Sequence, residues 1–259
     1  MRAIVTGAAR GIGRAICLRL ARDAAAGGGA KLVLSDQRVG DLQAVIAEVQ
    51  ALGGEAIAVA GDIADPALPA EIVAASAVFG GLDALVSNAG FAIPGPLADY
   101  ALDDWDKVFA VHVRAPWLLA KAAYPALKAS RGAVVVTASV SGTNAQAPLG
   151  AYSASKAAAL MLVRQLANEW GPDGIRVNAF SPGLTITPGT AAAYAAPDAH
   201  AQRASRVPLR RMAEADDMAG VVAFLLSQDA AYVHGVDLLV DGGLSNTVMA
   251  ALDMNGWKK

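Results

Sequence analysis

Cysteine is almost absent from this chain: its 259 residues include a single one, Cys17, and the three histidines lie far apart in the sequence. An internal disulfide is therefore excluded, and no Cys/His cluster has the spacing of a zinc site. We expect a reducing compartment. Cys17 follows a glycine-rich loop on a predicted helix, where it is expected to be a small packing residue rather than a nucleophile.

Runs of like charge and long apolar runs are missing too. The net charge is -2, and no basic run is longer than a pair such as Arg210-Arg211, which excludes binding to nucleic acid as the main activity. Every apolar stretch is interrupted before the roughly 20 residues that a membrane span needs. The N-terminal segment has too few consecutive apolar residues to form the core of a signal peptide. A soluble, cytoplasmic protein is expected, with neither a nucleic acid nor a membrane as partner.

The sequence does contain short runs rich in Val, Ile and Leu, which alternate with longer helical patterns. Because these runs are continuously apolar, both faces of each strand should be covered, as in a parallel sheet between two layers of helices. The length suits one domain. We therefore predict a single-domain α/β fold with a doubly wound parallel sheet, the Rossmann fold, with strands at 3–6, 32–35, 56–60, 84–87, 133–138, 176–180 and 237–240.

Three glycines, Gly7, Gly11 and Gly13, follow the first predicted strand and open an amphipathic helix. Backbone N–H groups at such a junction bind a dinucleotide pyrophosphate, and a Cβ would block the approach. Asp36 ends the second strand, where a carboxylate accepts hydrogen bonds from the adenosine ribose and repels a 2′-phosphate. This favours NAD over NADP, although Arg10 and Arg38 could pair with that phosphate.

Tyr152 and Lys156 lie four residues apart, so both project from one face of a helix. A phenol has a pKa of about 10, and a nearby ammonium together with the positive nicotinamide ring should lower it. Tyr152 then becomes a usable general base. Ser139 follows a predicted strand at its carboxyl end, where it can donate a hydrogen bond to the substrate oxygen.

These motifs resemble those of the short-chain dehydrogenase/reductase family, and the match runs from Thr6 to Gly243. The family pattern also includes an acidic residue after the third strand, an Asn-Ala-Gly triplet and a Pro-Gly pair. The resemblance implies that Asp62 and Ile63 hold the adenine, that Asn88 steadies the sheet and that Thr187 contacts the nicotinamide carboxamide. The implied cofactor-binding residues are Gly7, Arg10, Gly11, Ile12, Gly13, Asp36, Asp62, Ile63, Asn88, Ala89, Gly90, Tyr152, Lys156, Pro182, Gly183, Thr185 and Thr187.

His112 departs from the family pattern, because it stands where the family usually has an asparagine that helps hold a water in a proton relay to the lysine. Three explanations stay open. The relay contact is a backbone carbonyl that any residue supplies, or the neutral imidazole binds the water with its one donor and one acceptor, or His112 is a buried structural residue.

The substrate region combines polar and apolar residues. The resemblance places it after the Asn-Ala-Gly triplet, after Ser139 and in an irregular segment at 184–211, which we call the substrate loop. Long loops of this kind are usually functional lids or disordered segments, and we take this one as a candidate lid. Its polar candidates, Ser141, Asn144, Gln146 and Arg203, favour a sugar, a polyol or a small hydroxy compound over a steroid or a fatty chain.

Together with the resemblance, these residues predict an NAD-dependent oxidoreductase that transfers a hydride between the nicotinamide cofactor and a secondary alcohol or carbonyl carbon. Two other functions remain open from the sequence. One is an NADP-dependent carbonyl reductase acting on a 3-oxoacyl compound or a ketone, which Asp36 disfavours. The other is a non-catalytic cofactor-binding protein, which would be expected to lack Tyr152 or Lys156.

The resemblance also implies a homo-oligomer, commonly a tetramer. The tail at residues 244–259 carries apolar side chains that would need a cover on a monomer, namely Leu244, Val248, Met249, Leu252 and Trp257.

Overall fold

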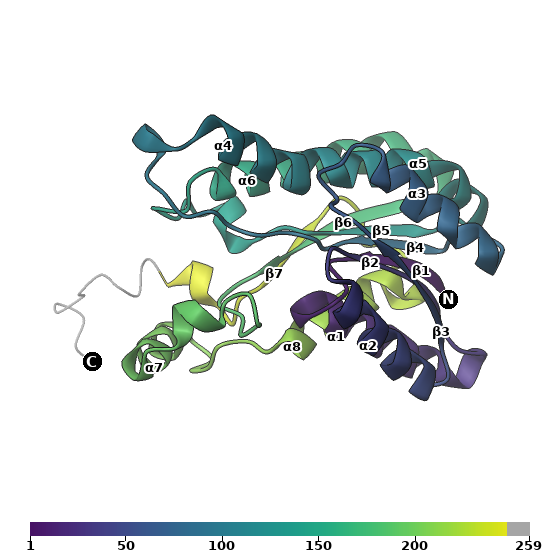
Figure 1. Cartoon of the computed structure of the whole chain (residues 1–259), viewed down its shortest axis with the longest axis horizontal. Coiled ribbons are helices and arrows are strands. Elements are labelled where there is room, and N and C mark those ends of the chain that lie inside the picture. The colour runs from purple at the N-terminus through teal and green to yellow at the C-terminus, as the bar shows by residue number, and fades with distance from the viewer. Residues whose placement is uncertain (248–259) are drawn as a thin grey trace.

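One seven-stranded sheet organises residues 1–247, the part of the chain that the computed structural model describes (Figure 1). All six strand pairs are parallel, in the order β3-β2-β1-β4-β5-β6-β7. The seven predicted strands are confirmed, and β6 continues two residues past its predicted end, to Pro182. The strands are β1 (Arg2–Thr6), β2 (Lys31–Asp36), β3 (Glu55–Ala60), β4 (Ala84–Ser87), β5 (Ala133–Thr137), β6 (Arg176–Pro182) and β7 (Asp237–Val240).

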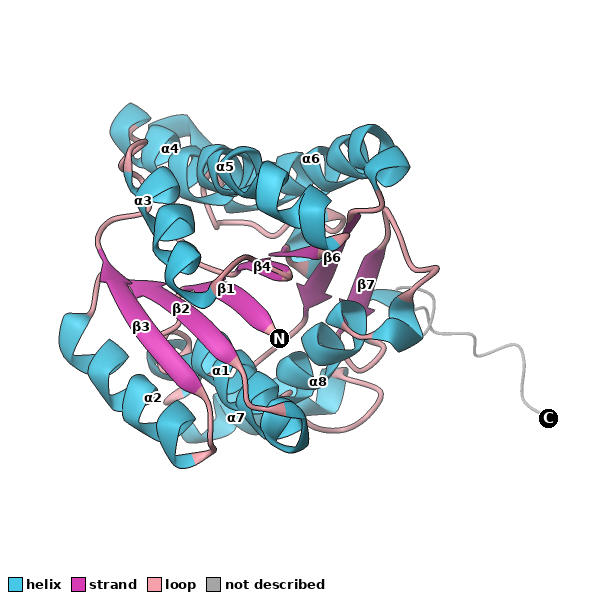
Figure 2. Ribbon diagram, turned by 90° about the vertical axis from the view of Figure 1, so that its right-hand side faces the viewer, coloured by secondary structure: helices cyan, strands magenta, loops and turns pink. Residues whose placement is uncertain are grey.

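Helices cover both faces of the sheet, as Figure 2 shows. One layer holds α1 (Gly11–Ala24), α2 (Val39–Ala51) and α8 (Ala215–Leu226), and the opposite layer holds α3 (Leu68–Ala75), α4 (Leu102–Phe109), α5 (Ala115–Ser130) and α6 (Tyr152–Trp170). Each layer packs on its own apolar core. The central strands β4 and β5 are buried along their whole length, which explains their continuous apolar sequence.

The substrate loop corrects one expectation, because it is not irregular throughout. It contains a 3₁₀ turn, η7 (Ala191–Tyr194), and a helix, α7 (Pro197–Arg206). The sequence of α7 has no apolar residue larger than alanine or proline, so it lacks the stripe of large apolar residues by which amphipathic helices are recognised, and periodicity does not reveal it. Figure 1 places α7 near the end of the sheet from which α6 begins.

The direction of strand order reverses between β1 and β4, because β2 and β3 lie on one side of β1 and the later strands on the other. Open α/β sheets bind their ligands at such a point, beyond the carboxyl ends of the strands. The polar residues that follow β4 and β5, Asn88 and Ser139, therefore reach the same edge as the glycine loop.

In residues 1–247, no helix is both long enough and apolar enough to span a membrane. The tail predicted at 244–259 begins with the 3₁₀ turn η9 (Leu244–Asn246). Its residues Val248, Met249, Leu252 and Trp257 lie outside the described residues.

Candidate active site

The glycine loop is closed tightly against the start of α1. Gly7 and Gly11 have φ of 65° and 55°, in the left-handed region that favours glycine. A Cβ on Gly13 would lie 2.0 Å from the carbonyl oxygen of Gly7. The three glycines thus leave a cradle of bare backbone at a helix N-terminus, which fits the pyrophosphate of a dinucleotide.

Asn88 ties three strands together beside this loop. Its side-chain Nδ2 donates to the carbonyl oxygen of Thr6 at 3.1 Å, and its Oδ1 accepts from Oγ1 of Thr137 at 3.1 Å. Its backbone N–H donates to Oγ1 of Thr6 at 3.0 Å. One amide side chain therefore fixes the ends of β1, β4 and β5, where the glycine loop and Ser139 begin.

Of the two acidic residues predicted to bind the adenosine half, Asp36 ends β2 and Asp62 lies in the turn after β3. Asp36 accepts from the backbone N–H of Ala9 at 3.2 Å and of Arg38 at 3.1 Å, so its carboxylate closes the rim of the glycine loop. Asp62 accepts from the backbone N–H of Ala64 at 3.0 Å, while Ile63 is buried. Arg10 and Arg38 are exposed beside Asp36.

Ser139, Tyr152 and Lys156 meet at the carboxyl end of β5. Tyr152 begins α6, and Nζ of Lys156 lies 5.7 Å from the centre of its ring. The Lys156 ammonium is buried and donates to the carbonyl oxygen of Thr137 at 2.7 Å. Ser139 accepts from the backbone N–H of Ser141 at 3.1 Å and hydrogen-bonds with the Tyr152 phenol.

Burial is the main influence on the pKa values of this group. Burial raises the pKa of Tyr152, while the hydrogen bond with Ser139 acts in the opposite direction. Burial also lowers the pKa of Lys156 to about 7. The expected lowering of the Tyr152 pKa thus needs the nicotinamide charge as well as the Lys156 ammonium, since burial opposes both charged forms.

His112 lies in a π-helical turn, η4 (Ala110–Arg114), between α4 and α5. Its Nε2 accepts from the backbone N–H of Phe91 at 3.2 Å, and its Nδ1 lies 2.8 Å from Oγ of Ser155, which donates its proton to the carbonyl oxygen of Tyr152. Because Nε2 accepts and the Ser155 proton is used elsewhere, Nδ1 must carry the imidazole proton. Neither nitrogen is left for a water, which favours the two explanations that need no water-binding imidazole.

His112 also stays neutral. Burial, followed by the nearby Lys156 charge, lowers the pKa of His112 to about 2. The unfolded chain takes up a proton on this residue below about pH 6.5, whereas the folded chain does not. Stability associated with the neutral imidazole is therefore present above pH 6.5 and is lost as the pH falls below it.

His112→Asn is expected to abolish this pH dependence. The variant should be less stable at pH 7, because one short amide cannot reach both Phe91 and Ser155. Its deficit against wild type should shrink by about 2 kcal/mol between pH 7 and pH 5, since wild type alone loses about 1.4 kcal/mol per pH unit below 6.5. Urea unfolding at the two pH values measures this difference. An unchanged deficit would mean that the folded protein protonates His112.

Thr187, the residue predicted to contact the nicotinamide carboxamide, lies over the glycine loop. A Cβ on Gly11 would come within 3.3 Å of Cβ of Thr187. The Thr187 hydroxyl is 3.2 Å from that of Thr190, which donates to the carbonyl oxygen of Thr185 at 2.8 Å. Three threonines therefore fix the first part of the substrate loop above the cradle. Gly183, after Pro182, is tied to β7 by a 3.0 Å bond from its N–H to the carbonyl oxygen of Val240.

The predicted substrate residues fall into two groups. The Ser141 hydroxyl donates to Oε1 of Gln146 at 2.9 Å, and Nδ2 of Asn144 donates to the carbonyl oxygen of Val140 at 3.2 Å. These side chains thus bond to their own loop. Arg203 lies apart from them on α7, with its guanidinium 5.0 Å from the centre of the Tyr194 ring.

Two site residues escape sequence reasoning, namely Ser155 and Tyr194. Ser155 reads as part of a small-residue helix, and its bond to His112 depends on how η4 packs against α6. Tyr194 approaches Tyr152 closely enough to raise the pKa of that phenol. One signal was available for it, because Tyr194 is the only Phe, Trp or Tyr in residues 184–211.

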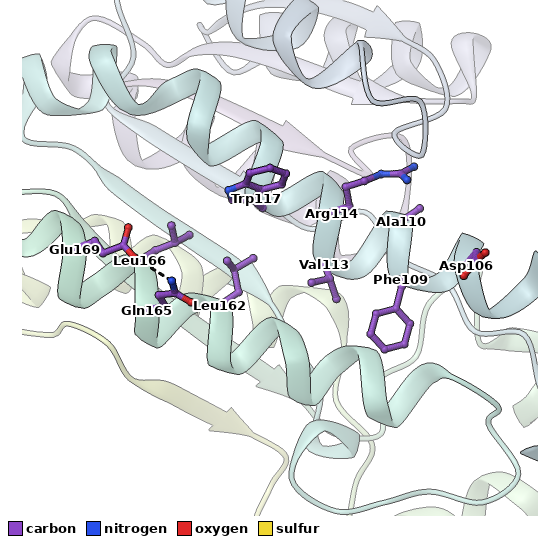
Figure 3. Close-up of a pocket in the computed structure, with 10 residues that line it drawn as sticks. All are labelled: Asp106, Phe109, Ala110, Val113, Arg114, Trp117, Leu162, Gln165, Leu166 and Glu169. Carbon is purple, nitrogen blue, oxygen red and sulfur yellow. Dashed lines mark hydrogen bonds between the residues drawn. The ribbon is translucent and has the colours of Figure 1, made fainter.

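A cavity of about 690 Å³ lies elsewhere, between α6 and the run from α4 to α5 (Figure 3). Phe109 and Trp117 line it from the run between α4 and α5, and Leu162 and Glu169 line it from α6. Ser139, Tyr152 and Lys156 do not line this cavity, so it is separate from the candidate active site.

Known proteins are similar to this chain along nearly its whole length. A family model described as enoyl-(acyl carrier protein) reductase matches residues 7–245. A 2,5-dichloro-2,5-cyclohexadiene-1,4-diol dehydrogenase of Sphingobium indicum is 36% identical, over 94% of this chain and 95% of its own length.

Two solved structures are also similar to this chain over nearly its whole length. One, described as an NAD(P)-dependent gluconate 5-dehydrogenase of Beutenbergia cavernae with bound NADP, has a TM-score of 0.87 and 37% identity, covering 94% of this chain and 96% of that one. The other is a short-chain dehydrogenase of Burkholderia cenocepacia in complex with NADP, with a TM-score of 0.85 and 40% identity, covering 95% and 97%.

Proposed function

This chain belongs to the short-chain dehydrogenase/reductase family, and on that premise we propose that it is an NAD-dependent oxidoreductase of secondary alcohols, with sugars, polyols and small hydroxy compounds as its substrate class. One observation carries the proposal: Ser139, Tyr152 and Lys156 meet at the sheet edge where the glycine loop also opens.

The residues that would hold the cofactor surround the cradle. The glycine loop would bind the pyrophosphate, Asp36 the adenosine ribose, Asp62 and Ile63 the adenine, and Thr187 the carboxamide. When bound, the oxidised cofactor supplies the acceptor for the hydride that leaves the substrate carbon, and a positive charge beside Tyr152.

Each catalytic side chain has one task at the substrate oxygen. The Tyr152 phenolate takes the proton of the substrate hydroxyl as the alcohol becomes a carbonyl, and returns it in the reverse direction. Ser139 accepts from the Ser141 N–H, which leaves its own proton to donate to the substrate oxygen. Lys156, held on the Thr137 carbonyl, presents its ammonium under the Tyr152 ring and favours phenolate.

The substrate class rests on the mixed lining of the site and on the relatives. A cyclic diol and a sugar acid are named for two of them, and both are compounds with several oxygen atoms. An NADP-dependent carbonyl reductase is the second candidate, because both solved structures contain NADP. Asp36 supports NAD, since its carboxylate would repel a 2′-phosphate.

The proposal extends to assembly and to the loop at 184–211. A homotetramer would cover apolar surface such as Trp117 and Met161, whose exposed fractions are 44% and 58%. The substrate loop would close over the bound substrate, because its start is fixed above the glycine loop and Tyr194 approaches Tyr152.

One assay tests the reaction and the cofactor together. The purified protein is given NAD⁺ or NADP⁺ with a panel of sugars, polyols and simple secondary alcohols, and reduced cofactor is followed by its absorbance. We expect turnover with NAD⁺ on at least one polyhydroxy compound. Turnover confined to ketone or 3-oxoacyl reduction with NADPH would replace this proposal with the second candidate.

Asp36→Ala is expected to reverse the cofactor preference in that assay. Loss of the carboxylate removes the ribose contact and the repulsion of the 2′-phosphate. The ratio of kcat/KM for NAD⁺ to that for NADP⁺ should fall at least tenfold, or about 1.4 kcal/mol. Asp41→Ala, an exposed carboxylate in the first turn of α2, removes the same charge nearby and should change nothing. A wild-type protein that already prefers NADP⁺ tenfold would contradict the assignment.

A further inference from the structure

Three hydrogen bonds in series connect the loop after β4 to the first turn of α6. The backbone N–H of Phe91 donates to Nε2 of His112 at 3.2 Å, and Nδ1 of His112 donates to Oγ of Ser155 at 2.8 Å. The Ser155 hydroxyl in turn donates to the carbonyl oxygen of Tyr152 at 2.7 Å. We call this series the His112 bridge. His112 and Ser155 are 2% and 0% exposed, so water does not compete for these bonds.

One end of the His112 bridge lies against the cofactor cradle. A Cβ on Gly7 would come within 2.9 Å of Cα of Ala89, so the backbone of the loop after β4 packs directly on the glycine loop. A Cβ on Gly90 would come within 3.1 Å of Nε2 of His112. Phe91 follows Gly90 in the chain, and its N–H makes the first bond of the bridge. This end is therefore fixed relative to the place where a dinucleotide would bind.

The other end holds Tyr152 at two points. Ser155 is bonded to the Tyr152 carbonyl oxygen, and the His112 ring packs edge-to-face against the Tyr152 ring, with centroids 5.4 Å apart and planes at 84°. A tyrosine side chain turns about two dihedral angles, so a fixed backbone and a packed ring together set where its phenolic oxygen lies.

The two ends of the bridge require different nitrogens of one imidazole. Nε2 must accept from Phe91 while Nδ1 donates to Ser155, and only the neutral tautomer with its proton on Nδ1 does both. His112 is thus bound through its side chain on both sides, at the position where the family pattern has an asparagine.

We propose that His112 and Ser155 are positioning residues that fix the phenolic oxygen of Tyr152 relative to the cofactor cradle. The proposal rests on the proposed function and adds no chemical step to it. It matters for the rate because the phenol must meet the substrate hydroxyl while the substrate carbon faces the cofactor, and a misplacement of about 1 Å can cost about 10²-fold in rate.

Ser155→Ala removes the middle of the His112 bridge. Because neither residue of the bridge contacts the proposed pyrophosphate or substrate groups, kcat should fall at least about tenfold, while KM and the Kd for NADH stay close to wild type. The assay uses the substrate and cofactor that the panel identifies. Ser76→Ala is the matched control, because Ser76 is also buried and its hydroxyl also donates to a carbonyl three residues earlier, that of Val73, at 2.7 Å. It should leave kcat unchanged.

His112→Gln tests whether the two residues act as a unit. The glutamine carboxamide reaches about as far as Nε2 of histidine, so it can accept from the Phe91 N–H but leaves Ser155 without its donor. Its kcat should fall like that of Ser155→Ala, and the double variant should lose no more kcat than the weaker of the two single variants. Losses that multiply in the double variant would show independent effects and overturn the bridge.

The tautomer of His112 gives a readout that needs no substrate. The chain has three histidines, so ¹⁵N-labelled histidine gives few NMR signals, and the His112 signals are those missing from His112→Gln. His234 is an internal reference of the opposite tautomer, because its Nδ1 accepts from the Val177 N–H at 3.1 Å and its Nε2 lies 2.9 Å from the carbonyl oxygen of Ala167. At pH 7 the wild-type protein should carry the His112 proton on Nδ1.

The outcomes separate this proposal from the proposed function. Wild-type kcat in Ser155→Ala, or an equal loss in Ser76→Ala, overturns the positioning role and keeps the oxidoreductase. A His112 proton on Nε2 in the wild-type protein overturns the bridge whatever the activity, and this measurement stands even if Ser155→Ala does not fold. Absence of turnover with every compound of the panel overturns the proposed function itself.

Discussion

Tyr152→Phe is expected to lower kcat by a factor of roughly 10² to 10⁴ while the cofactor still binds. The substitution removes the only phenolic oxygen that moves a proton at the substrate, and such groups typically contribute that much. It leaves the ring, its edge-to-face contact with His112 at 5.4 Å and the Lys156 ammonium in place. Measured kcat, together with NADH affinity from fluorescence, separates lost chemistry from lost binding.

Tyr232→Phe is the matched control for this experiment. Tyr232 is fully exposed, so removing its hydroxyl should change neither kcat nor stability. Wild-type turnover in Tyr152→Phe would remove Tyr152 from the proton step. A loss of NADH binding equal to the loss of turnover would point instead to a damaged cofactor site.

Gly13→Ala is expected to have the second large effect, on both folding and cofactor affinity. Its Cβ would lie 2.0 Å from the Gly7 carbonyl oxygen, and the colliding atom belongs to backbone that cannot rotate away. Overpacking typically costs about 1–3 kcal/mol, and here we expect at least about 3 kcal/mol because the loop itself must move. Displacing Gly7 would also open the pyrophosphate cradle. Urea unfolding and NADH titration measure the two losses.

Gly40→Ala gives the opposite expectation for the same chemical change. Gly40 lies in the first turn of α2, and a Cβ there meets nothing within 4 Å. Alanine should therefore stabilise the helix, by up to about 1 kcal/mol, through its higher helix propensity. If Gly13→Ala were as stable as Gly40→Ala and bound NADH normally, the tight packing of the glycine loop would not be what holds the cofactor.

Local sequence patterns predict the fold because each strand is buried on both faces. The runs that become β4 and β5 are continuously apolar, and no surface requirement interrupts them. The glycine loop is predictable for a similar reason, since Gly13 faces a backbone contact that no other residue allows. These constraints act within a few residues of chain, so a single sequence displays them.

The rest of the site depends on contacts between distant segments. The His112 bridge joins residues 21 and 43 positions away, and no local pattern encodes it. The pKa of Lys156 follows from complete burial, which depends on the packing of α6 on β6 and on the turn that follows β5. Helix α7 has no apolar residue larger than alanine or proline, so its place beside Tyr194 comes from tertiary structure alone. Sequence reasoning named Arg203 but not the tyrosine on which it stacks.

The separation of the two apolar cores has a consequence for how this protein can change over evolutionary time. Ala8 and Ala9 of the glycine loop, and Ile16 of α1, pack in the core shared by α1, α2 and α8. Val111 and Leu160, behind His112 and the catalytic helix, pack in the core on the opposite face. Substitutions that accumulate under α1 can therefore retune which cofactor is held, while those under α6 retune the chemistry.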